Sequence, residues 1–133
     1  MRAWAKWIKD QQYDLLSESG HHVAADASST HQAGPSPMEL VLTALCSCTS
    51  ADVVAILSKK REPFTGLTVS AVAEQAPEPP RVFNRIQLTY RISGNVSEKA
   101  VQDAVSLSKN KYCSVSKMLE KSATIESVIE YVH

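Results

Sequence analysis

The residues of this chain whose chemistry could serve a reaction are three cysteines, Cys46, Cys48 and Cys113. A cysteine thiolate acts as a nucleophile, a metal ligand or a redox group. Cys46 and Cys48 are two residues apart in a helical pattern, where each residue turns by about 100°, so their side chains point about 200° apart. This spacing is not a Cys-x-x-Cys redox motif, and it prevents the two thiols from sharing one ligand or forming a disulfide with each other.

Histidines could supplement the cysteines as metal ligands. The chain contains His21, His22, His31 and His133. Cys46 and Cys48 are a poor pair of zinc ligands, and no spacing among the cysteines and histidines matches a structural zinc site. We therefore expect neither a metal site nor a cofactor.

Cys113 and Cys48 differ in their surroundings. Cys113 begins a short helical pattern with lysines on both sides, and a helix N-terminus and nearby cations lower a thiol pKa. Cys48 lies in the middle of an apolar helix, where the pKa of its thiol should rise unless a cation from elsewhere reaches it. For each thiol the alternative is an inert role as a small buried hydrophobe, because free cysteine is among the most buried residue types.

The stretch that carries Cys46 and Cys48, residues 36–60, is predicted to be the central helix. Ser36 is a good N-cap, and Glu39 completes a Ser-x-x-Glu capping box. Between positions 40 and 57 the only charged residue is Asp52, and apolar or small residues occupy every face of the helix. Such a helix must be covered all round.

Two environments could cover this helix. Its length is near what a bilayer requires, but the hydroxyl residues within it and the acid in its middle disfavour a membrane span. A domain of 133 residues has difficulty burying a long helix on all sides by itself. The sequence therefore predicts a soluble protein in which a second copy of the chain covers the helix, that is, a homodimer.

The composition is that of a globular protein, with 44% hydrophobic and 21% charged residues. Fourteen basic and fourteen acidic residues cancel, so the net charge gives no reason to expect nucleic acid or an anionic membrane surface as a partner. The first ten residues, MRAWAKWIKD, lack the apolar region of a signal peptide. We expect a cytoplasmic protein, in which thiols stay reduced.

Around the central helix, alternating apolar residues predict strands and a 3.6-residue period predicts further helices. Strands are expected at residues 2–9, 13–17, 22–25, 67–73, 82–92 and 124–131, and helices at 97–110 and 113–121, with an interruption at 110–112. Hairpins and grouped strands are typical of antiparallel sheets, so the fold class is α+β, with a single domain spanning residues 1–133.

Two motifs carry a resemblance to a known family. The stretch PSPMELVLTALCSCTSADVV is followed, with about 65 residues between the matching cysteines, by KYCSVSKMLEK. Both motifs and the order of the predicted elements resemble the OsmC/Ohr family of cytoplasmic thiol proteins, and within it the YhfA-like branch. The resemblance covers essentially the whole chain and implies an OsmC-like fold with a long buried central helix in an intertwined homodimer.

The resemblance also implies a reaction. Cys48 matches the first cysteine of the family peroxidases, and Cys113, in a Cys-x-x-Ser element with Ser116, matches the second. In those enzymes the first thiolate reduces an organic hydroperoxide and becomes a sulfenic acid, and the second resolves it as a disulfide. A dithiol reductant then resets the pair. The implied function is antioxidant defence in the oxidative stress response, with Cys48 and Cys113 catalytic.

The groups that activate the thiol in the family peroxidases are not matched. Those enzymes have an arginine in the N-terminal region, and no arginine lies between positions 10 and 35 here. They also have a glutamate directly after the helix proline, where this chain has Met38. Glu39 lies nine residues before Cys48, about 180° around the helix, which favours its capping role. The remaining candidate cations are Arg2, Arg61 and Arg81.

Two alternatives to the peroxidase therefore stay open. The first is a non-enzymatic OsmC-like dimer that binds a small hydrophobic ligand or senses thiol redox state at the same interface pocket. The second is a structural dimer whose buried thiols are inert.

Overall fold

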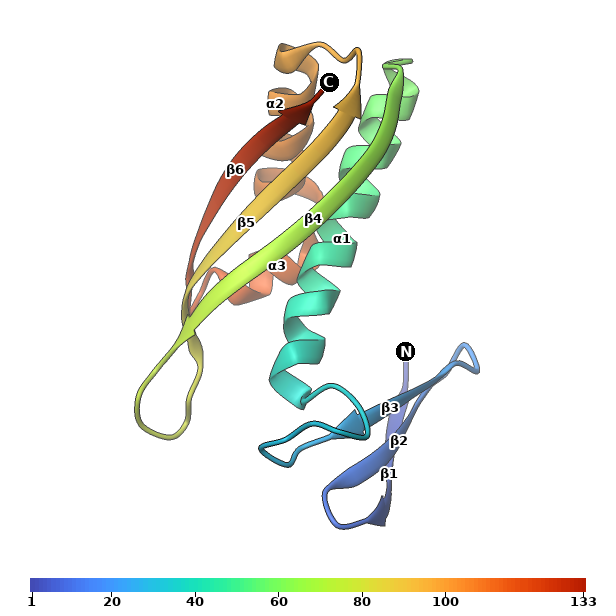
Figure 1. The fold of residues 1–133 in the computed structure, drawn as a ribbon, viewed down its shortest axis with the longest axis vertical. Coiled ribbons are helices and arrows are strands. Elements are labelled where there is room, and N and C mark those ends of the chain that lie inside the picture. The colour runs from blue at the N-terminus through green and yellow to red at the C-terminus, as the bar shows by residue number, and fades with distance from the viewer. The chain divides into compact units, whose positions relative to one another are not determined.

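The computed structural model describes all of residues 1–133 and divides into two compact units, residues 1–42 and 43–133 (Figure 1). The first unit holds strands β1 (Ala3–Lys9), β2 (Gln12–Ser17) and β3 (His22–Asp26), and helix α1 (Pro37–Lys59) begins in it and continues into the second. The second unit adds β4 (Phe64–Gln75), β5 (Phe83–Gly94), α2 (Glu98–Leu107), the π-helical turn η1 (Ser108–Tyr112), α3 (Ser114–Leu119) and β6 (Thr124–Val132). This is the order of elements that the sequence predicts, and the α+β class is confirmed.

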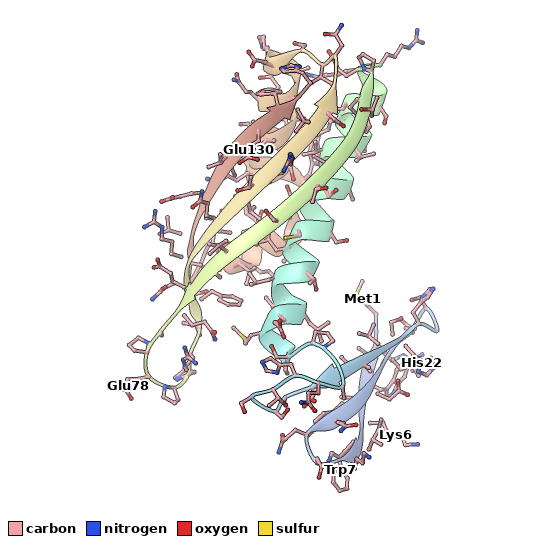
Figure 2. All side chains as sticks on the ribbon, viewed as in Figure 1. Met1, Lys6, Trp7, His22, Glu78 and Glu130 are labelled. Atoms are coloured by element: carbon pink, nitrogen blue, oxygen red, sulfur yellow. The ribbon has the colours of Figure 1, made fainter.

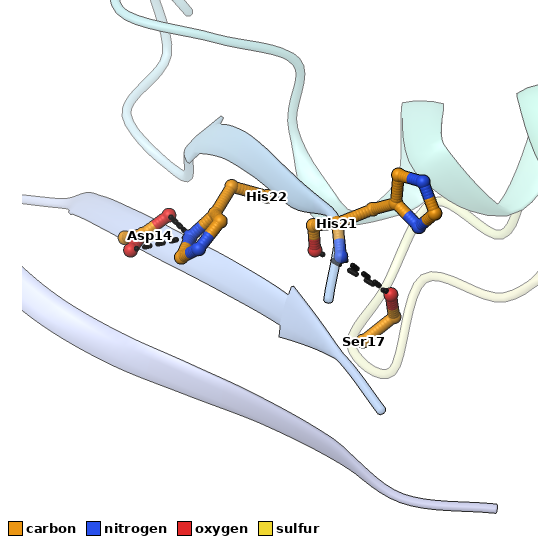
Figure 3. A network of polar contacts seen from close by, with 4 residues as sticks. All are labelled: Asp14, Ser17, His21 and His22. Atoms are coloured by element: carbon orange, nitrogen blue, oxygen red, sulfur yellow. Dashed lines mark hydrogen bonds and ion pairs between the residues drawn. The ribbon is translucent and has the colours of Figure 1, made fainter. Parts of the chain in front are cut away.

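The first unit is an antiparallel meander in the order β1-β2-β3. Its β1 strand is exposed along its whole length, and Figure 2 shows the Trp7 side chain projecting from it. Polar contacts fasten β3 to β2 (Figure 3): His22 Nδ1 lies 3.0 Å from a carboxylate oxygen of Asp14, and the His21 amide donates to Ser17 Oγ at 3.2 Å. These contacts join β3 to β2. The apolar side chains of β1 remain exposed.

The second unit contains a sheet in the order β4-β5-β6, and here one prediction was wrong. The β4 and β5 strands pair antiparallel, as expected, but β6 pairs parallel to β5, with Ile86 opposite Ile125. The physical reason is the crossover: α2, η1 and α3 carry the chain back before β6 begins, so β6 runs in the same direction as β5. The proline-rich connection between β4 and β5 projects beyond the sheet, with Glu78 near its tip (Figure 2).

The core of the second unit lies between this sheet and the helices, which cover one of its faces (Figure 1). From Ile86 to Ile92 alternate residues of β5 face that core, and the residues between them are exposed or half-buried. The buried β5 side chains are Phe83, Ile86, Leu88, Tyr90 and Ile92. From α2 the core receives Ala100, Val101, Ala104 and Val105.

Helix α1 begins with the predicted capping box. Ser36 Oγ accepts a hydrogen bond from the Glu39 amide at 3.1 Å, and a Glu39 carboxylate oxygen accepts one from the Ser36 amide at 2.9 Å. These bonds hold the pKa of Glu39 below its usual value. Glu39 therefore serves the helix start, as its position in the sequence indicates.

One chain covers α1 along a single stripe. The buried residues, four apart, are Leu45, Thr49, Val53 and Leu57. By length and composition α1 could cross a membrane, but its buried stripe packs in a protein core and carries the hydrogen-bonded Thr49 hydroxyl. The other faces are half-buried or exposed, and Val54 is 37% exposed. The chain alone covers only the stripe that faces the sheet, which agrees with the prediction that a chain of this size cannot bury the helix on all sides by itself.

After α2 the helix widens. The predicted helix at 97–110 ends at Leu107, and η1 follows as one π-helical turn, closed by a 2.8 Å bond from the Cys113 amide to the Ser108 carbonyl oxygen. The sequence predicted an interruption here, which begins at Ser108 rather than at Asn110. The wider turn delivers the chain to Cys113, the N-cap of α3.

Candidate functional site

Three side chains of the second unit converge beside α1. Cys48 and Asp52 lie four residues apart on α1, so they share one face of the helix. Cys113 comes to them from the junction of η1 and α3. The two Sγ atoms and a carboxylate oxygen of Asp52 all lie within 4.8 Å of one another. Cys113 is 2% exposed, whereas Cys48 and Asp52 are half-buried, so the cluster is reached from the α1 side.

Cys113 is held by the start of α3. The Ser116 amide donates to Cys113 Sγ at 3.4 Å, and Ser116 Oγ donates to the Cys113 carbonyl oxygen at 3.1 Å. Burial raises the pKa of the Cys113 thiol; the Ser116 amide opposes this, and the neighbouring Cys48 thiol adds to it. The Cys-x-x-Ser element therefore fixes the position of Cys113 through two local bonds, while burial keeps its thiol protonated at neutral pH.

Asp52 is held by a chain of buried hydroxyl groups. Ser108 Oγ donates to Asp52 Oδ2 at 2.8 Å and lies 2.9 Å from Thr49 Oγ1, which in turn lies 2.6 Å from the Tyr90 hydroxyl. Burial raises the pKa of Tyr90, which keeps its hydroxyl neutral, and the Thr49 hydrogen bond opposes that rise. The network joins α1, β5 and η1, so the carboxylate has a fixed position beside the two thiols.

The charged residue in the cluster is the acidic residue Asp52. The pKa of the Cys113 thiol is shifted by burial, Ser116 and Cys48, and by no lysine or arginine. A carboxylate beside a thiol disfavours the thiolate, whereas a cation would favour it. This arrangement differs from the activated thiol that the family resemblance implies.

Cys46 lies outside the cluster. It is half-buried on α1, and burial raises the pKa of its thiol. All three cysteines are free thiols. Cys48 rather than Cys46 is therefore the α1 cysteine that meets Cys113.

Two of the three candidate arginines have partners of their own. Arg2 Nε donates to a Glu18 carboxylate oxygen at 3.0 Å, and Arg81 Nε donates to the Ala76 carbonyl oxygen at 3.0 Å. Arg61 is exposed just beyond α1. The lysines near Cys113 are also engaged: Lys109 donates to the Ile125 carbonyl oxygen, Lys111 lies over the Tyr112 ring, and Lys117 pairs with Glu120.

Three of the four histidines that could have served as ligands are likewise used locally. His22 pairs with Asp14, and His21 Nδ1 lies 3.0 Å from Ser19 Oγ. His31 Nδ1 lies 3.1 Å from the Asp26 carbonyl oxygen.

Sequence reasoning found the two cysteines but missed Asp52 and the residues that hold it. One signal was available: Asp52 is the only charge between positions 40 and 57 and lies one helical turn after Cys48. Ser108 and Tyr90 carried no such signal, because their approach to α1 depends on how the chain folds across 56 and 41 residues.

The hydroxyl network also contributes to stability. Replacing Thr49 by valine leaves the buried Tyr90 hydroxyl and Ser108 without their shared partner, which should lower the free energy of unfolding by about 1–3 kcal/mol. Ser47→Ala, at an exposed position of the same helix, should change it by less than about 0.5 kcal/mol. Urea unfolding of both variants measures the difference. Equal stabilities would mean that the network contributes nothing beyond ordinary surface contacts.

Comparisons with known proteins give consistent results. The family description of OsmC-like proteins matches residues 29–128. Protein YhfA of Escherichia coli (strain K12) is 41% identical over 133 residues, covering 99% of this chain and 98% of that protein.

Solved structures share the fold. A hypothetical protein from Aquifex aeolicus VF5 is 28% identical, with a TM-score of 0.89 and coverage of 98% of this chain and 95% of its own. An organic hydroperoxide resistance protein from Elizabethkingia anophelis is 14% identical, with a TM-score of 0.73 and coverage of 98% and 94%, and so demonstrates likeness of fold alone.

Proposed function

The chain belongs to the OsmC-like family, and from that premise we propose that it is a thiol-dependent peroxidase that reduces organic hydroperoxides. Membership of this family, together with structural neighbours named organic hydroperoxide resistance proteins, supports a role in peroxide stress. The observation that carries the finer proposal is the approach of the Cys48 and Cys113 sulfur atoms to within 4.8 Å. The half-buried Cys48 thiol would react with the peroxide, and the buried Cys113 thiol would then react with Cys48.

The reaction divides into three steps. The Cys48 thiolate attacks the outer oxygen of the hydroperoxide, the O–O bond breaks, and the alkoxide takes up a proton and leaves as the alcohol. Cys48 is then a sulfenic acid. The Cys113 sulfur attacks the Cys48 sulfur, the S–O bond breaks, water leaves, and a disulfide remains. A dithiol reductant, oxidised to its own disulfide, returns both cysteines to thiols.

In this proposal the cation that favours the Cys48 thiolate comes from assembly into the homodimer, because the cluster in one chain contains only the Asp52 carboxylate as a charge. The two compact units would act as one OsmC-like domain within each subunit. We place the protein in the cytoplasm, where a reducing environment keeps the three thiols free.

A second candidate function is favoured by the position of Asp52. The Asp52 carboxylate lies within 4.8 Å of both sulfur atoms, and a carboxylate beside a thiol does not favour thiolate chemistry. The dimer would then be a non-enzymatic binder of a small hydrophobic ligand or a slow thiol redox sensor.

Turnover of tert-butyl hydroperoxide or cumene hydroperoxide with a dithiol reductant tests the proposal. We expect measurable steady-state turnover, faster than with hydrogen peroxide, because a pocket bounded by α1 and a partner chain would be largely apolar. Hydrogen peroxide serves as the matched substrate control. If the reduced protein consumes neither class of peroxide above the background rate, the second candidate function takes its place.

Exposed apolar surface supports the homodimer. Trp4, Trp7 and Ile8 of β1 are 48%, 62% and 56% exposed, and α1 leaves apolar faces uncovered. Apolar surface on this scale usually marks an interface. Light scattering at micromolar concentration should therefore give twice the 14.5 kDa chain mass. A stable monomer would contradict both the dimer and a site completed by a partner subunit.

A further inference from the structure

We propose that Cys48, Asp52 and Cys113 bind a thiophilic divalent cation, with Zn²⁺ as the best fit. This inference goes beyond the proposed function and does not depend on peroxidase activity. The sequence predicted no metal site, because the side chains of Cys46 and Cys48 diverge and no spacing among the cysteines and histidines matches a structural zinc site. The fold instead assembles a different set, with two sulfur ligands and one carboxylate oxygen within 4.8 Å of one another.

The donor set suits zinc. Thiolate sulfur binds Zn²⁺ at about 2.3 Å and carboxylate oxygen at about 2.0–2.2 Å. In a tetrahedral site those bond lengths separate two sulfur atoms by about 3.8 Å and a sulfur from an oxygen by about 3.6 Å. The observed limit of 4.8 Å exceeds these separations by about 1 Å, so a rotamer adjustment is enough to close the site.

Each ligand is also held in place. Ser108 donates to Asp52 Oδ2 at 2.8 Å and is itself backed by Thr49, while the Ser116 amide fixes Cys113 Sγ. Cys48 and Asp52 lie one turn apart on a long helix, which sets their spacing. Hydrogen bonds of this kind orient metal ligands and raise affinity.

A bound cation would also explain why the Asp52 carboxylate lies beside two thiols. A carboxylate works against a thiolate that must attack peroxide, but it complements a metal ion that two thiolates bind. Three protein ligands would leave a fourth position for water. A cation bound to both sulfur atoms would block disulfide formation, so metal loading and thiol oxidation would exclude each other at this site.

Titration of the reduced, full-length protein with Co²⁺, followed by Zn²⁺, tests this inference without any peroxide. We expect a thiolate-to-cobalt charge-transfer band in the near ultraviolet that saturates at one Co²⁺ per subunit and disappears as Zn²⁺ is added. Cys113→Ser should lose the band. Cys46→Ser, which leaves all three ligands in place, should keep it.

Asp52→Asn is the decisive variant, because it keeps the size of the side chain and an oxygen that accepts from Ser108. We expect its affinity for Zn²⁺ to fall at least about tenfold. Both thiols should still react with a thiol-specific reagent, and the circular dichroism spectrum should equal that of the wild type. No charge-transfer band in the wild type, a band that depends on Cys46, or an unchanged affinity in Asp52→Asn would each overturn the proposal. Loss of peroxidase activity leaves this readout unaffected, so the two proposals fail separately.

Discussion

Replacing Cys48 by serine is expected to reduce the turnover of tert-butyl hydroperoxide by at least about 10³-fold, to the background rate. A serine hydroxyl does not ionise near neutral pH and is a far weaker nucleophile than a thiolate, so the first O–O cleavage would be lost. Steady-state consumption of peroxide with excess dithiol reductant measures the effect. The hydroxyl is close to the thiol in size, so the fold should be unchanged.

Cys46→Ser is the matched control for this prediction. It removes a thiol from the same helix, two residues away and outside the cluster of Cys48, Asp52 and Cys113. Its turnover should equal that of the wild type. If Cys46→Ser loses activity while Cys48→Ser retains it, the nucleophile is Cys46. If the wild type and both variants are equally inactive, the enzyme hypothesis fails.

Replacing Cys113 by serine should permit about one turnover per subunit and then stop. The Cys48 thiolate would still cleave one peroxide, but its sulfenic acid would have no neighbouring thiol to form a disulfide. Quantifying the alcohol released gives the stoichiometry. Mass spectrometry of the unreduced protein should find one added oxygen on Cys48, where the wild type should show a Cys48–Cys113 disulfide within one chain.

Sustained turnover by Cys113→Ser would show that the external reductant attacks the sulfenic acid directly. A disulfide between Cys48 and Cys46 would be a different failure, because the two side chains diverge on α1 and would have to leave the helical conformation to meet. Both outcomes leave Cys48 as the nucleophile while removing Cys113 as its resolving partner.

The parts of this molecule that sequence predicts well are those governed by local rules. The Ser36–Glu39 capping box, the alternating pattern of β5 and the N-cap of α2 at Ser97 all depend on neighbours within a few residues, and each is found in the structure. The family resemblance supplied the pairing of Cys48 with Cys113, which no local pattern contains.

The parts that sequence did not predict depend on distant contacts. The direction of β6 follows from the route of the chain through α2, η1 and α3. The place of Asp52 in the cluster follows from the approach of Ser108 and Cys113 to α1, which residue spacing alone does not encode.

The π-helical turn at Ser108–Tyr112 makes the cluster of Cys48, Asp52 and Cys113 sensitive to the length of the chain. One bond, from the Cys113 amide to the Ser108 carbonyl oxygen, closes a ring whose first residue holds Asp52 and whose last supplies the second thiol. A turn of this kind contains one residue more than an α-helical turn. Losing that residue would rotate all that follows by about 100° and carry Cys113 away from α1. The number of residues in this turn therefore decides whether the two sulfur atoms meet.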